Sequence, residues 1–529
     1  MSEIRLSQAR GRWILLATVL GSGVASLDAT VVNVALPRLA DDLSASMAGL
    51  QWTVNAYTLT LAGLILLGGS LGDRFGRRRV FVIGVVWFAT ASVLCGAAPD
   101  VGTLIAARAL QGVGGALLTP GSLAIIQASF DEDDRPRAVG AWSGLSGVAG
   151  AVGPFAGGWL VEAAGWRWVF LLNAPLSVIV VLVALRHVPE TRDPDATGRF
   201  DLAGAAQAAL TLPWPTYALT EAPNGAGGGV MVAAVAGVAC AVGFVLVERR
   251  LGRGGGRRNR PQPMLPLTMF ANREFSAVNA VTFIVYGGMG VMFFLFVLNL
   301  QVVSGFTPIA AGTALLPVTV LMLLLSARAG ALAQRIGPRW PMTVGLVLAA
   351  AGMALVSRVG AHASYWRDVL PGVVVFGLGL SAMVAPLTAT VLASADVRHA
   401  GIASGVNNAV ARAAGLLAVA AIPPLAGLTG DAYRNPAMFS SGFRQAMLVC
   451  AGMLLAGAVL TLFTVRDDAL RAAPAGQVPE CQTHCAVGAP PLEQPERVTA
   501  TPAVAGAGAD AGGGGTPGGP AGPADTGIG

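Results

Sequence analysis

The stretch "GSLGDRFGRRRVFVIG", residues 69–84, decides how the sequence is interpreted. It places an aspartate and four arginines within Asp73–Arg79, between two long apolar runs at 50–70 and 80–98. A hydrocarbon core about 30 Å thick requires roughly 20 apolar residues in a helix, and each run is close to this length. The charged stretch therefore predicts a short loop between two membrane-spanning helices.

The composition of the whole chain also indicates a membrane protein. Hydrophobic residues make up 54% of the sequence and charged residues only 12%, outside the usual range of soluble domains. The positive net charge comes from arginine alone, since the sequence contains no lysine. Arginines that flank spans set membrane topology, so we expect no nucleic-acid partner. Cys95, Cys240 and Cys450 lie in apolar runs and predict small core residues rather than disulfides.

We expect an all-α polytopic membrane protein with fourteen spans, at residues 13–35, 50–70, 80–98, 103–128, 138–161, 168–187, 202–220, 230–248, 275–300, 309–329, 342–358, 369–393, 402–425 and 445–465. The seventh is the weakest, because Pro213 and Pro215 interrupt it. It is retained because the arginine-rich loop after residue 248 would otherwise fall on the outer side of the membrane.

The arginines predict the orientation of these spans. With the N-terminus inside, most arginines at span ends face the cytoplasm, as is usual for such proteins. The outer side keeps Arg38, Arg167, Arg358, Arg367, Arg434 and Arg444. Both termini are therefore expected in the cytoplasm. The bias towards arginine, alanine and glycine suggests a GC-rich bacterial genome, and hence the bacterial cytoplasmic membrane.

A second loop repeats the pattern of the first. "GALAQRIGPRW" at 330–340 follows 261 positions after residue 69 (330 − 69), and five residues match, namely Gly69, Leu71, Arg74, Gly76 and Arg78 with Gly330, Leu332, Arg335, Gly337 and Arg339. Gln334 replaces the counterpart of Asp73, so we assign the closed-state ion pairing to the first loop alone. Repeated helical bundles with a site at the repeat interface are typical of secondary transporters.

The repeat divides the chain into parts. We expect a cytoplasmic N-terminus at 1–12, an N-terminal six-helix half at 13–187, two inserted helices at 202–248, a basic cytoplasmic loop at 249–274, a C-terminal six-helix half at 275–465, and a cytoplasmic tail at 466–529. The tail is rich in alanine, glycine and proline, a composition that predicts disorder.

Four motifs resemble the major facilitator superfamily, and specifically its fourteen-helix drug:proton antiporter branch. Besides the loop at 69–79, they are "LDATVVNVALPRLADDL" (27–43), "RALQGVGGALLTPGSLAII" (108–126) and "GAWSGLSGVAGAVGPFAGGWL" (140–160). The last differs from the family pattern at Ala149, where glycine is preferred. The resemblance implies the major facilitator fold and antiport of drugs or antibiotics.

The resemblance also implies two conformational elements. One is a cytoplasmic latch in the first loop, formed by Gly69, Asp73, Arg74, Gly76, Arg77 and Arg78. The other is a flexible seal in the fifth span, formed by Gly153, Pro154, Gly157 and Gly158. Small residues four apart let helices touch closely, and proline kinks a helix. Ordinary small-residue packing is the alternative interpretation of the second element.

Asp28 and Arg108 are charged residues inside predicted spans, which marks them as candidates for function. Counted along their helices at 1.5 Å per residue, both lie about 22 Å from the inner face. An arginine beside a carboxylate favours its charged form, whereas separation favours protonation. We therefore expect the two to couple conformational change to proton uptake, an expectation that the resemblance supports. The alternative is a purely structural pair.

Further polar residues predict a substrate cavity, formed by Trp52, Asn55, Asn408 and Arg412. Asn408 and Arg412 are four residues apart and share a helix face. Arg412 could bind an anionic part of the substrate, or it could lock helices together through backbone carbonyls. Trp52 could instead lie at the membrane interface, as aromatic residues commonly do.

Two other motifs predict no cofactor. "CQTHC" at 481–485 offers Cys481, His484 and Cys485, but a structural zinc ion needs four ligands, so we expect no metal. "GRGGGRRNR" at 252–260 lacks the lysine and Ser/Thr of a P-loop and is expected to contact anionic lipid. The proton gradient rather than ATP is therefore the expected energy source, and no enzymatic residue set is present.

The sequence favours proton-coupled efflux of small amphipathic compounds by alternating access between the two halves. The expected partners are the substrate, protons and the lipid bilayer, and we expect the chain to work as a monomer. An uptake symporter or facilitator for a small metabolite remains an alternative, as does a membrane sensor that transports nothing.

Overall fold

Long helices follow the apolar runs of the sequence in this computed structural model. It describes residues 4–470 except 132–133, 193–206, 208–209, 226, 253–266, 395–399 and 468–469. Most of the expected loop 249–274 and nearly all of the tail 466–529, including Cys481 and Cys485, lie outside the described residues. Apart from an isolated bridge between Ile4 and Phe130, the described part contains no β-structure.

The first half of the chain forms the helices α1 (Ala9–Leu43), α2 (Met47–Phe75), α3 (Arg77–Gly96), α4 (Val101–Ser129), α5 (Arg135–Ala163), α6 (Arg167–Leu171) and α7 (Asn173–His187). Local sequence sets several ends. Ser46 and Asp100 accept hydrogen bonds from the backbone at the starts of α2 and α4, which satisfies N–H groups that have no partner within the helix. Gly76, with φ of 113°, ends α2 and lets α3 begin at the next residue.

The second half forms η2 (Leu267–Ala271), α11 (Arg273–Val302), α12 (Pro308–Thr313), α13 (Leu316–Ile336), α14 (Arg339–Val356), η3 (Tyr365–Val369), α15 (Leu370–Ala393), α16 (Ala400–Leu425), η5 (Ala432–Arg434) and α17 (Pro436–Thr464). Gly337, with φ of 94°, joins α13 to α14 as Gly76 joins α2 to α3. In both of the matching loops, a glycine with positive φ thus forms a short turn between two helices.

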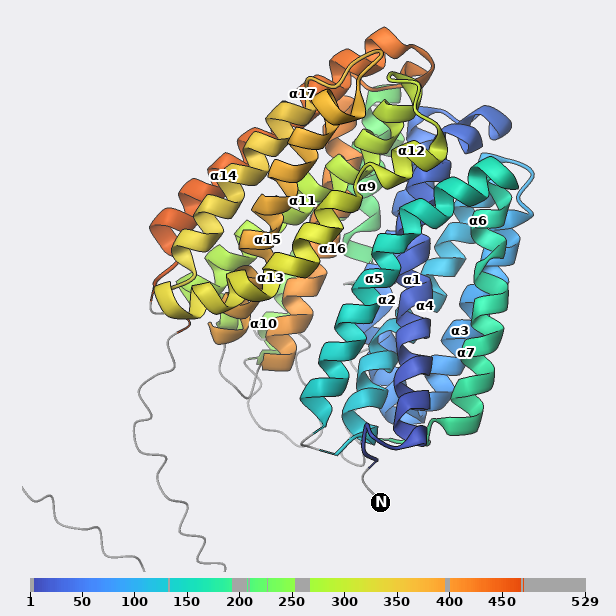
Figure 1. Ribbon diagram of the computed structural model, residues 1–529, viewed down its shortest axis with the longest axis vertical. Coiled ribbons are helices and arrows are strands. Elements are labelled where there is room, and N and C mark those ends of the chain that lie inside the picture. The colour runs from blue at the N-terminus through green and yellow to red at the C-terminus, as the bar shows by residue number, and fades with distance from the viewer. Residues whose placement is uncertain are drawn as a thin grey trace, which may run out of the picture. The chain divides into compact units, whose positions relative to one another are not determined.

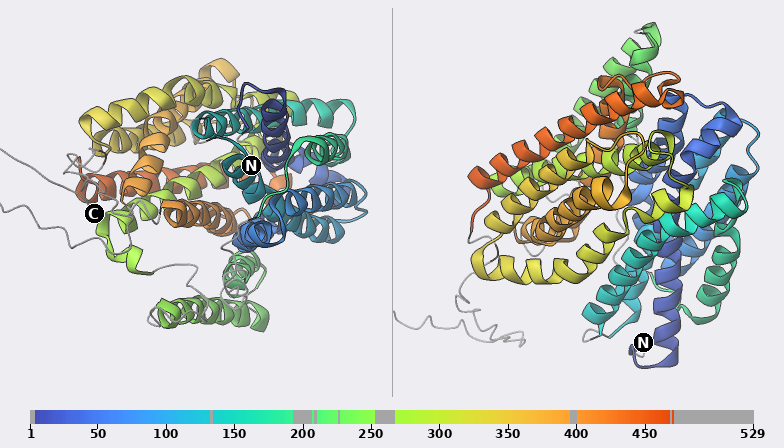
Figure 2. Two further views of the ribbon diagram at one scale, coloured as in Figure 1. Left: turned by 90° about the horizontal axis from the view of Figure 1, so that it is seen from below. Right: turned by 45° about the horizontal axis from the view of Figure 1, so that its top comes forward.

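Between the halves lie α9 (Pro213–Glu221), η1 (Ala222–Asn224) and α10 (Gly228–Gly252). Helix α9 contacts α2 and α16, and α10 packs against α9. The left view of Figure 2 shows these green helices beside the rest of the bundle rather than within it.

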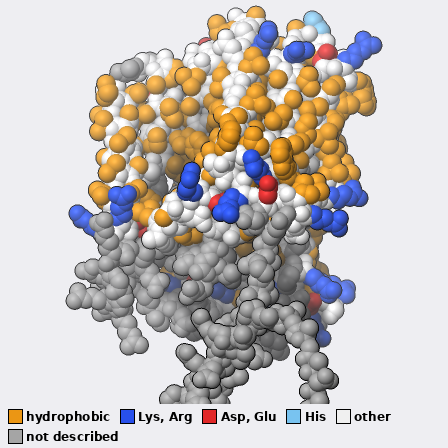
Figure 3. All heavy atoms as spheres, turned by 90° about the vertical axis from the view of Figure 1, so that its left-hand side faces the viewer, with side chains coloured by type: hydrophobic (Ala, Val, Ile, Leu, Met, Phe, Trp, Pro, Cys, Tyr) orange, Lys and Arg blue, Asp and Glu red, His pale blue; other side chains and the backbone are white. Residues whose placement is uncertain are grey.

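Eleven described helices are long and apolar enough to cross a membrane, and twelve if the bent α2 counts as one span. The prediction of fourteen spans is therefore not confirmed. Two of the predicted spans are not among these twelve helices. Span 138–161 lies within the 29-residue helix α5, and the first residues of span 202–220 lie outside the described part. The apolar side chains on the face drawn in Figure 3 form a broad surface bordered by arginines, the distribution expected beside lipid.

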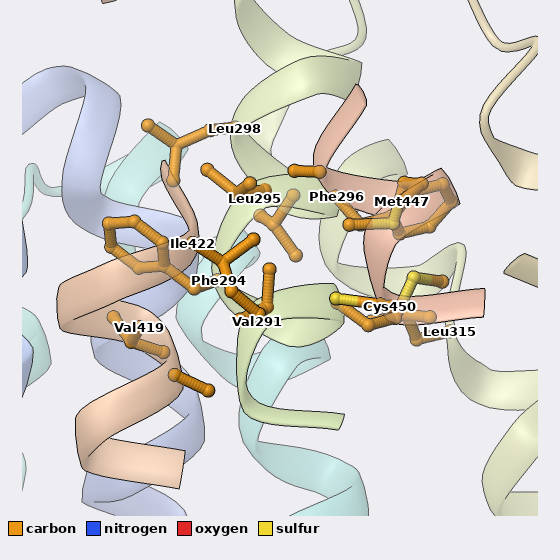
Figure 4. Close-up of a cluster of buried hydrophobic side chains, with 14 of the residues drawn as sticks. Val291, Phe294, Leu295, Phe296, Leu298, Leu315, Val419, Ile422, Met447 and Cys450 are labelled. Carbon is orange, nitrogen blue, oxygen red and sulfur yellow. The ribbon is translucent and has the colours of Figure 1, made fainter. Parts of the chain in front are cut away.

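Each half packs mainly within itself. Helix α4 contacts α2 and α3, and α5 contacts α1, while α14 and α13 contact α15 and α11 contacts α16 and α17. Figure 4 shows a cluster of buried side chains from α11, α16 and α17, including Phe294, Ile422 and Cys450.

Cys95 is buried, as Cys450 is, whereas Cys240 is only half-buried, so its prediction as a core residue is too strong. Cys95, Cys240 and Cys450 are all free thiols.

The halves meet at the end of the bundle opposite Ala9. There α5 packs against α12, α1 against α11 and α2 against α16. Three hydrogen bonds cross this contact, from Met47 N to Gly430 O (2.8 Å), from Gln51 Nε2 to Val419 O (2.7 Å) and from Gln301 Nε2 to Val34 O (3.0 Å). Towards the N-terminal end, the ribbons of the halves diverge (Figure 1).

Candidate functional site

Asp28 of α1 and Arg108 of α4 form an ion pair in the interior of the first half. Arg108 NH1 lies 2.5 Å from Asp28 Oδ2, and the side chains are 1% and 0% exposed. The equal depth expected from the sequence is thus accompanied by direct contact. Removing two charges from water is unfavourable unless each is paired and hydrogen-bonded, so the surrounding groups decide what this pair can do.

Gln111 bridges the two charges. Its Oε1 accepts a hydrogen bond from Arg108 NH1 (2.7 Å), and its Nε2 donates to Asp28 Oδ1 (2.9 Å). Gln111 follows Arg108 by three residues and therefore lies on the same helix face. Its position within the fourth-helix motif could have identified it, but the sequence interpretation did not select it.

Asn173 and Ser92 complete the polar network. Asn173 Nδ2 donates to Asp28 Oδ1 (2.9 Å) and to Ser92 Oγ (3.0 Å), and Ser92 Oγ donates to Phe170 O (2.8 Å). All three polar side chains near the carboxylate, Ser92, Gln111 and Asn173, are fully buried. Asn173 and Ser92 lie on α7 and α3, and no spacing in the sequence links them to Asp28.

The guanidinium of Arg108 is also held from α2. Its Nε donates to Thr53 O (3.1 Å), and its CZ lies 4.4 Å from the centroid of the Tyr57 ring. Such stacking of a cation on an aromatic ring is favourable, more so where water is excluded. Five helices of the first half, α1, α2, α3, α4 and α7, thus contribute to one site.

This arrangement suits an ionised carboxylate. Asp28 Oδ1 receives two amide donors, and Oδ2 receives Arg108. Hydrogen bonds and an opposite charge both favour the charged form. The carboxylate of α1 is thus held by donors from α4 and α7.

The residues predicted to line a cavity occupy different surroundings. Trp52 lies against the inserted helix α9, where its Nε1 donates to Glu221 Oε1 (3.1 Å). Asn55 is 1% exposed, and its Nδ2 has no hydrogen-bond partner among the described residues. On α16, Asn408 is exposed while Arg412 is half-buried. The structure thus places Trp52 at the contact with the inserted helices, a location that the sequence did not indicate.

The predicted latch residues pair within the first half. Arg77 donates to Asp73 from Nε (2.9 Å) and NH2 (2.8 Å), and Arg78 Nε lies 3.6 Å from Glu190 Oε2, three residues beyond α7. A Cβ at Gly76 would overlap the Glu190 carboxylate. Gly69 lies against Pro120 of α4 and Arg74 occupies the last turn of α2.

The second loop also carries an ion pair in this arrangement. Arg339 NH1 lies 3.9 Å from Asp467 Oδ2, while the assignment of closed-state pairing to the first loop alone stays a prediction. Asp467 is three residues beyond α17, as Glu190 is three beyond α7. The carboxylate comes from outside the repeated motif, so the replacement of aspartate by Gln334 did not indicate it.

The predicted seal residues lie where α5 contacts α1 and α12. A Cβ at Gly153 would overlap Thr30 Oγ1, and one at Gly157 would lie 2.7 Å from Val31 Cγ1. Gly158 instead faces the second half, where a Cβ would lie 2.6 Å from Pro308 O. In return, a Cβ at Gly312 would overlap Pro154 O. The contact of Gly312 with α5 was not predicted, because Gly312 lies in none of the motifs identified in the sequence.

Comparison with known proteins identifies the family. The model of the Major Facilitator Superfamily matches residues 18–419. The chain therefore belongs to this superfamily of membrane transporters.

Its curated relatives include antibiotic resistance proteins. The chain is 37% identical over 471 residues to the puromycin resistance protein pur8 of Streptomyces alboniger, covering 85% of this chain and 90% of that one. It is 33% identical to the tetracenomycin C resistance and export protein of Streptomyces glaucescens, covering 81% and 78%. It is 34% identical to the methylenomycin A resistance protein of Bacillus subtilis, covering 78% and 87%.

Solved structures agree on the fold. A bacterial homolog to the human lysosomal transporter Spinster, in an inward-facing and occupied conformation, superposes with a TM-score of 0.61 at 18% identity, covering 89% of this chain and 100% of that chain. A POT peptide transporter in complex with sulfate superposes with a TM-score of 0.62 at 14% identity, covering 88% and 98%.

Proposed function

We propose that the chain exports small amphipathic drugs or antibiotics across the bacterial cytoplasmic membrane in exchange for protons. The names of its relatives, which include resistance and export proteins, support efflux as the direction of transport. The buried Asp28–Arg108 pair supports proton coupling, and it is the observation that carries this part of the proposal.

The coupling follows from the network around Asp28. While α1, α4 and α7 remain packed as here, three donors contact the carboxylate. A change in helix packing that separates Asp28 from these donors leaves a charged group in a poorly solvated site, where proton uptake becomes favourable. Each proton that enters on one side and leaves on the other then accompanies one change of conformation.

Alternating access follows from how the halves touch. Their contacts gather at the end opposite Ala9, and arginines at the span ends favour the N-terminus on the cytoplasmic side. With that orientation, the halves are joined at the outer side here, and the substrate enters from the cytoplasm. Breaking the contacts among α1, α2, α5, α11, α12 and α16 while the other ends close then releases it outside.

We further assign the chain to the fourteen-helix branch of the superfamily, with both termini in the cytoplasm and two inserted helices between the halves. In this proposal the proton gradient is the energy source and no cofactor is needed. The inserted helices α9 and α10 fall between the halves in sequence, and α9 contacts α2 and α16 while α10 packs against α9. All five helices that hold Asp28 and Arg108 belong to one half, so a single chain supplies the complete coupling site and works as a monomer.

Efflux measurements with the full chain test this proposal. Cells that express it and are loaded with the lipophilic cation rhodamine 123 should lose the dye faster than control cells, and a protonophore should abolish the difference. Asp28→Asn keeps the shape of the side chain but removes the proton-binding group, so we expect at least a tenfold loss of efflux with normal membrane insertion. Protonophore-sensitive efflux at the wild-type rate by Asp28→Asn would refute the coupling role.

A further inference from the structure

Arg412 is a charged group within a span, and no counterion for it is present in the described part of the chain. It lies seven residues after Gly405 in the span Gly405–Leu425, which is about 10 Å along the helix axis. Its side chain makes no ion pair or hydrogen bond with the described part of the chain, and its Nε is shielded from solvent without an acceptor. Arginines inside membranes normally pair with acids or backbone carbonyls.

The buried acid of the first half, Asp28, cannot be the counterion of Arg412. Asp28 is already paired with Arg108 and receives two further donors, so the described interior of the first half is electrically balanced. Arg412 therefore adds one uncompensated positive charge. A half-buried charge of this sort is unfavourable unless a partner of opposite sign is supplied, and the described part of the chain supplies none to Arg412.

Asn55 supplies a second donor on the facing helix. Gln51 Nε2 donates to Val419 O across the contact between α2 and α16. Met47, earlier in α2, bonds to Gly430, which follows α16. The residue numbers thus rise in opposite directions along the contact, so the two helices are antiparallel. Asn55 lies one turn beyond Gln51 on the same face, and Arg412 lies two turns before Val419. Both follow the same line of contact, and the Asn55 Nδ2 donor also has no acceptor.

We propose that Arg412 and Asn55 bind the carboxylate of an organic anion, which makes amphipathic organic acids a substrate class of this transporter. Two unsatisfied donors, one of them charged, require an acceptor-rich, negatively charged group. The site lies at the contact between the halves, where a ligand can sense their movement. This inference rests on the proposed transport function and names the chemistry of its substrate.

Ligand binding to the purified full chain tests the inference without any proton gradient. Fluorescein, an organic carboxylate, and rhodamine 123, a cation on the same xanthene skeleton, are titrated and followed by fluorescence polarisation. Charge-assisted hydrogen bonds typically contribute enough to change affinity tenfold or more. We expect Arg412→Gln to weaken fluorescein binding at least tenfold, Asn55→Leu several-fold and Arg412→Lys less than Arg412→Gln.

Controls separate charge recognition from general damage. Arg358→Gln removes an exposed arginine beyond α14 and should leave fluorescein binding unchanged. Rhodamine 123 binding should not weaken in Arg412→Gln, because the cation gains nothing from the guanidinium. Benzoate should displace fluorescein, whereas the same concentration of chloride should not.

Several results would overturn the inference. They are absence of fluorescein binding to the wild-type chain, equal loss of both dyes in Arg412→Gln, and displacement by chloride as effective as by benzoate. Failure of proton-coupled efflux would instead count against the proposed function and leave the binding result intact, because binding requires no gradient.

Discussion

Asp73 and Arg77 form a two-pronged ion pair at the turn between α2 and α3. Both Nε and NH2 of Arg77 lie within 2.9 Å of Asp73 Oδ1. The pair spans a single helical turn and involves no residue of the second half. In this arrangement, the loop is therefore ordered by its own charges, while the ribbons of the two halves diverge on this side (Figure 1).

The first prediction concerns this pair. Asp73→Asn removes the charge but keeps an acceptor for Arg77, so a change in stability of about 1 kcal/mol or less is expected for such a partly exposed pair. Because Asp73 lies at the far end of α2 from Asn55, the substitution should lower kcat several-fold and change KM by less than twofold. Transport into everted vesicles measures both; a rise in KM with unchanged kcat would contradict a conformational role. Arg186→Gln, at an exposed arginine in the last turn of α7, is the control.

The second prediction concerns Asn173, which donates to Asp28 Oδ1. Asn173→Leu keeps the volume but removes one of the three donors to the buried carboxylate. One hydrogen bond to a charged group contributes about 1.5–3 kcal/mol, so the network around Asp28 is weakened. Transport measured in everted vesicles should therefore fall at least tenfold.

A buried asparagine outside the network provides the control for Asn173. Asn299 on α11 donates to Val359 O, and Asn299→Leu should transport within about threefold of the wild-type rate when compared at equal amounts of folded protein. An equal loss of transport in both variants, or a loss in neither, would mean that Asn173 only supports packing.

The third prediction concerns Gly158. Gly158→Ala places a methyl group 2.6 Å from Pro308 O and 2.7 Å from Ile309 Cα, and Gly158→Leu places more atoms there. The α5–α12 contact must then separate, so transport should fall several-fold in the alanine variant and more than tenfold in the leucine variant. Gly452→Leu, at an exposed helical glycine with open space around it, should transport normally. Wild-type transport by Gly158→Leu would show that close contact is not needed.

Much of the fold could be predicted from residue patterns that act locally. Apolar length set the spans, and the repeated Gly76 and Gly337 turns set the two halves. The number of spans could not be settled in the same way, because 202–220 contains prolines and several of its residues lie outside the described part of the chain. Hydropathy measures affinity for lipid, and it cannot distinguish a continuous span from an interrupted one.

The candidate site was predictable only for its charges. Asp28 and Arg108 could be found because an ionised group inside a span is unfavourable and therefore conspicuous. Ser92 and Asn173 are small, neutral and common in such helices, so nothing in the sequence separates them from packing residues. Their role depends on how α3 and α7 are placed around α1, which is set by tertiary packing.

The close approach of Gly158 to Pro308 and of Gly312 to Pro154 has a mechanical consequence for the proposed movement of the halves. Each glycine lies against backbone atoms of the other half, so these positions require close contact but provide no hydrogen bond of their own side chains. The side chains of Gln51 and Gln301 instead donate hydrogen bonds across the same contact. Under the proposed movement, substitutions at the glutamines would change how firmly the halves are joined, whereas substitutions at the glycines would change how closely they approach.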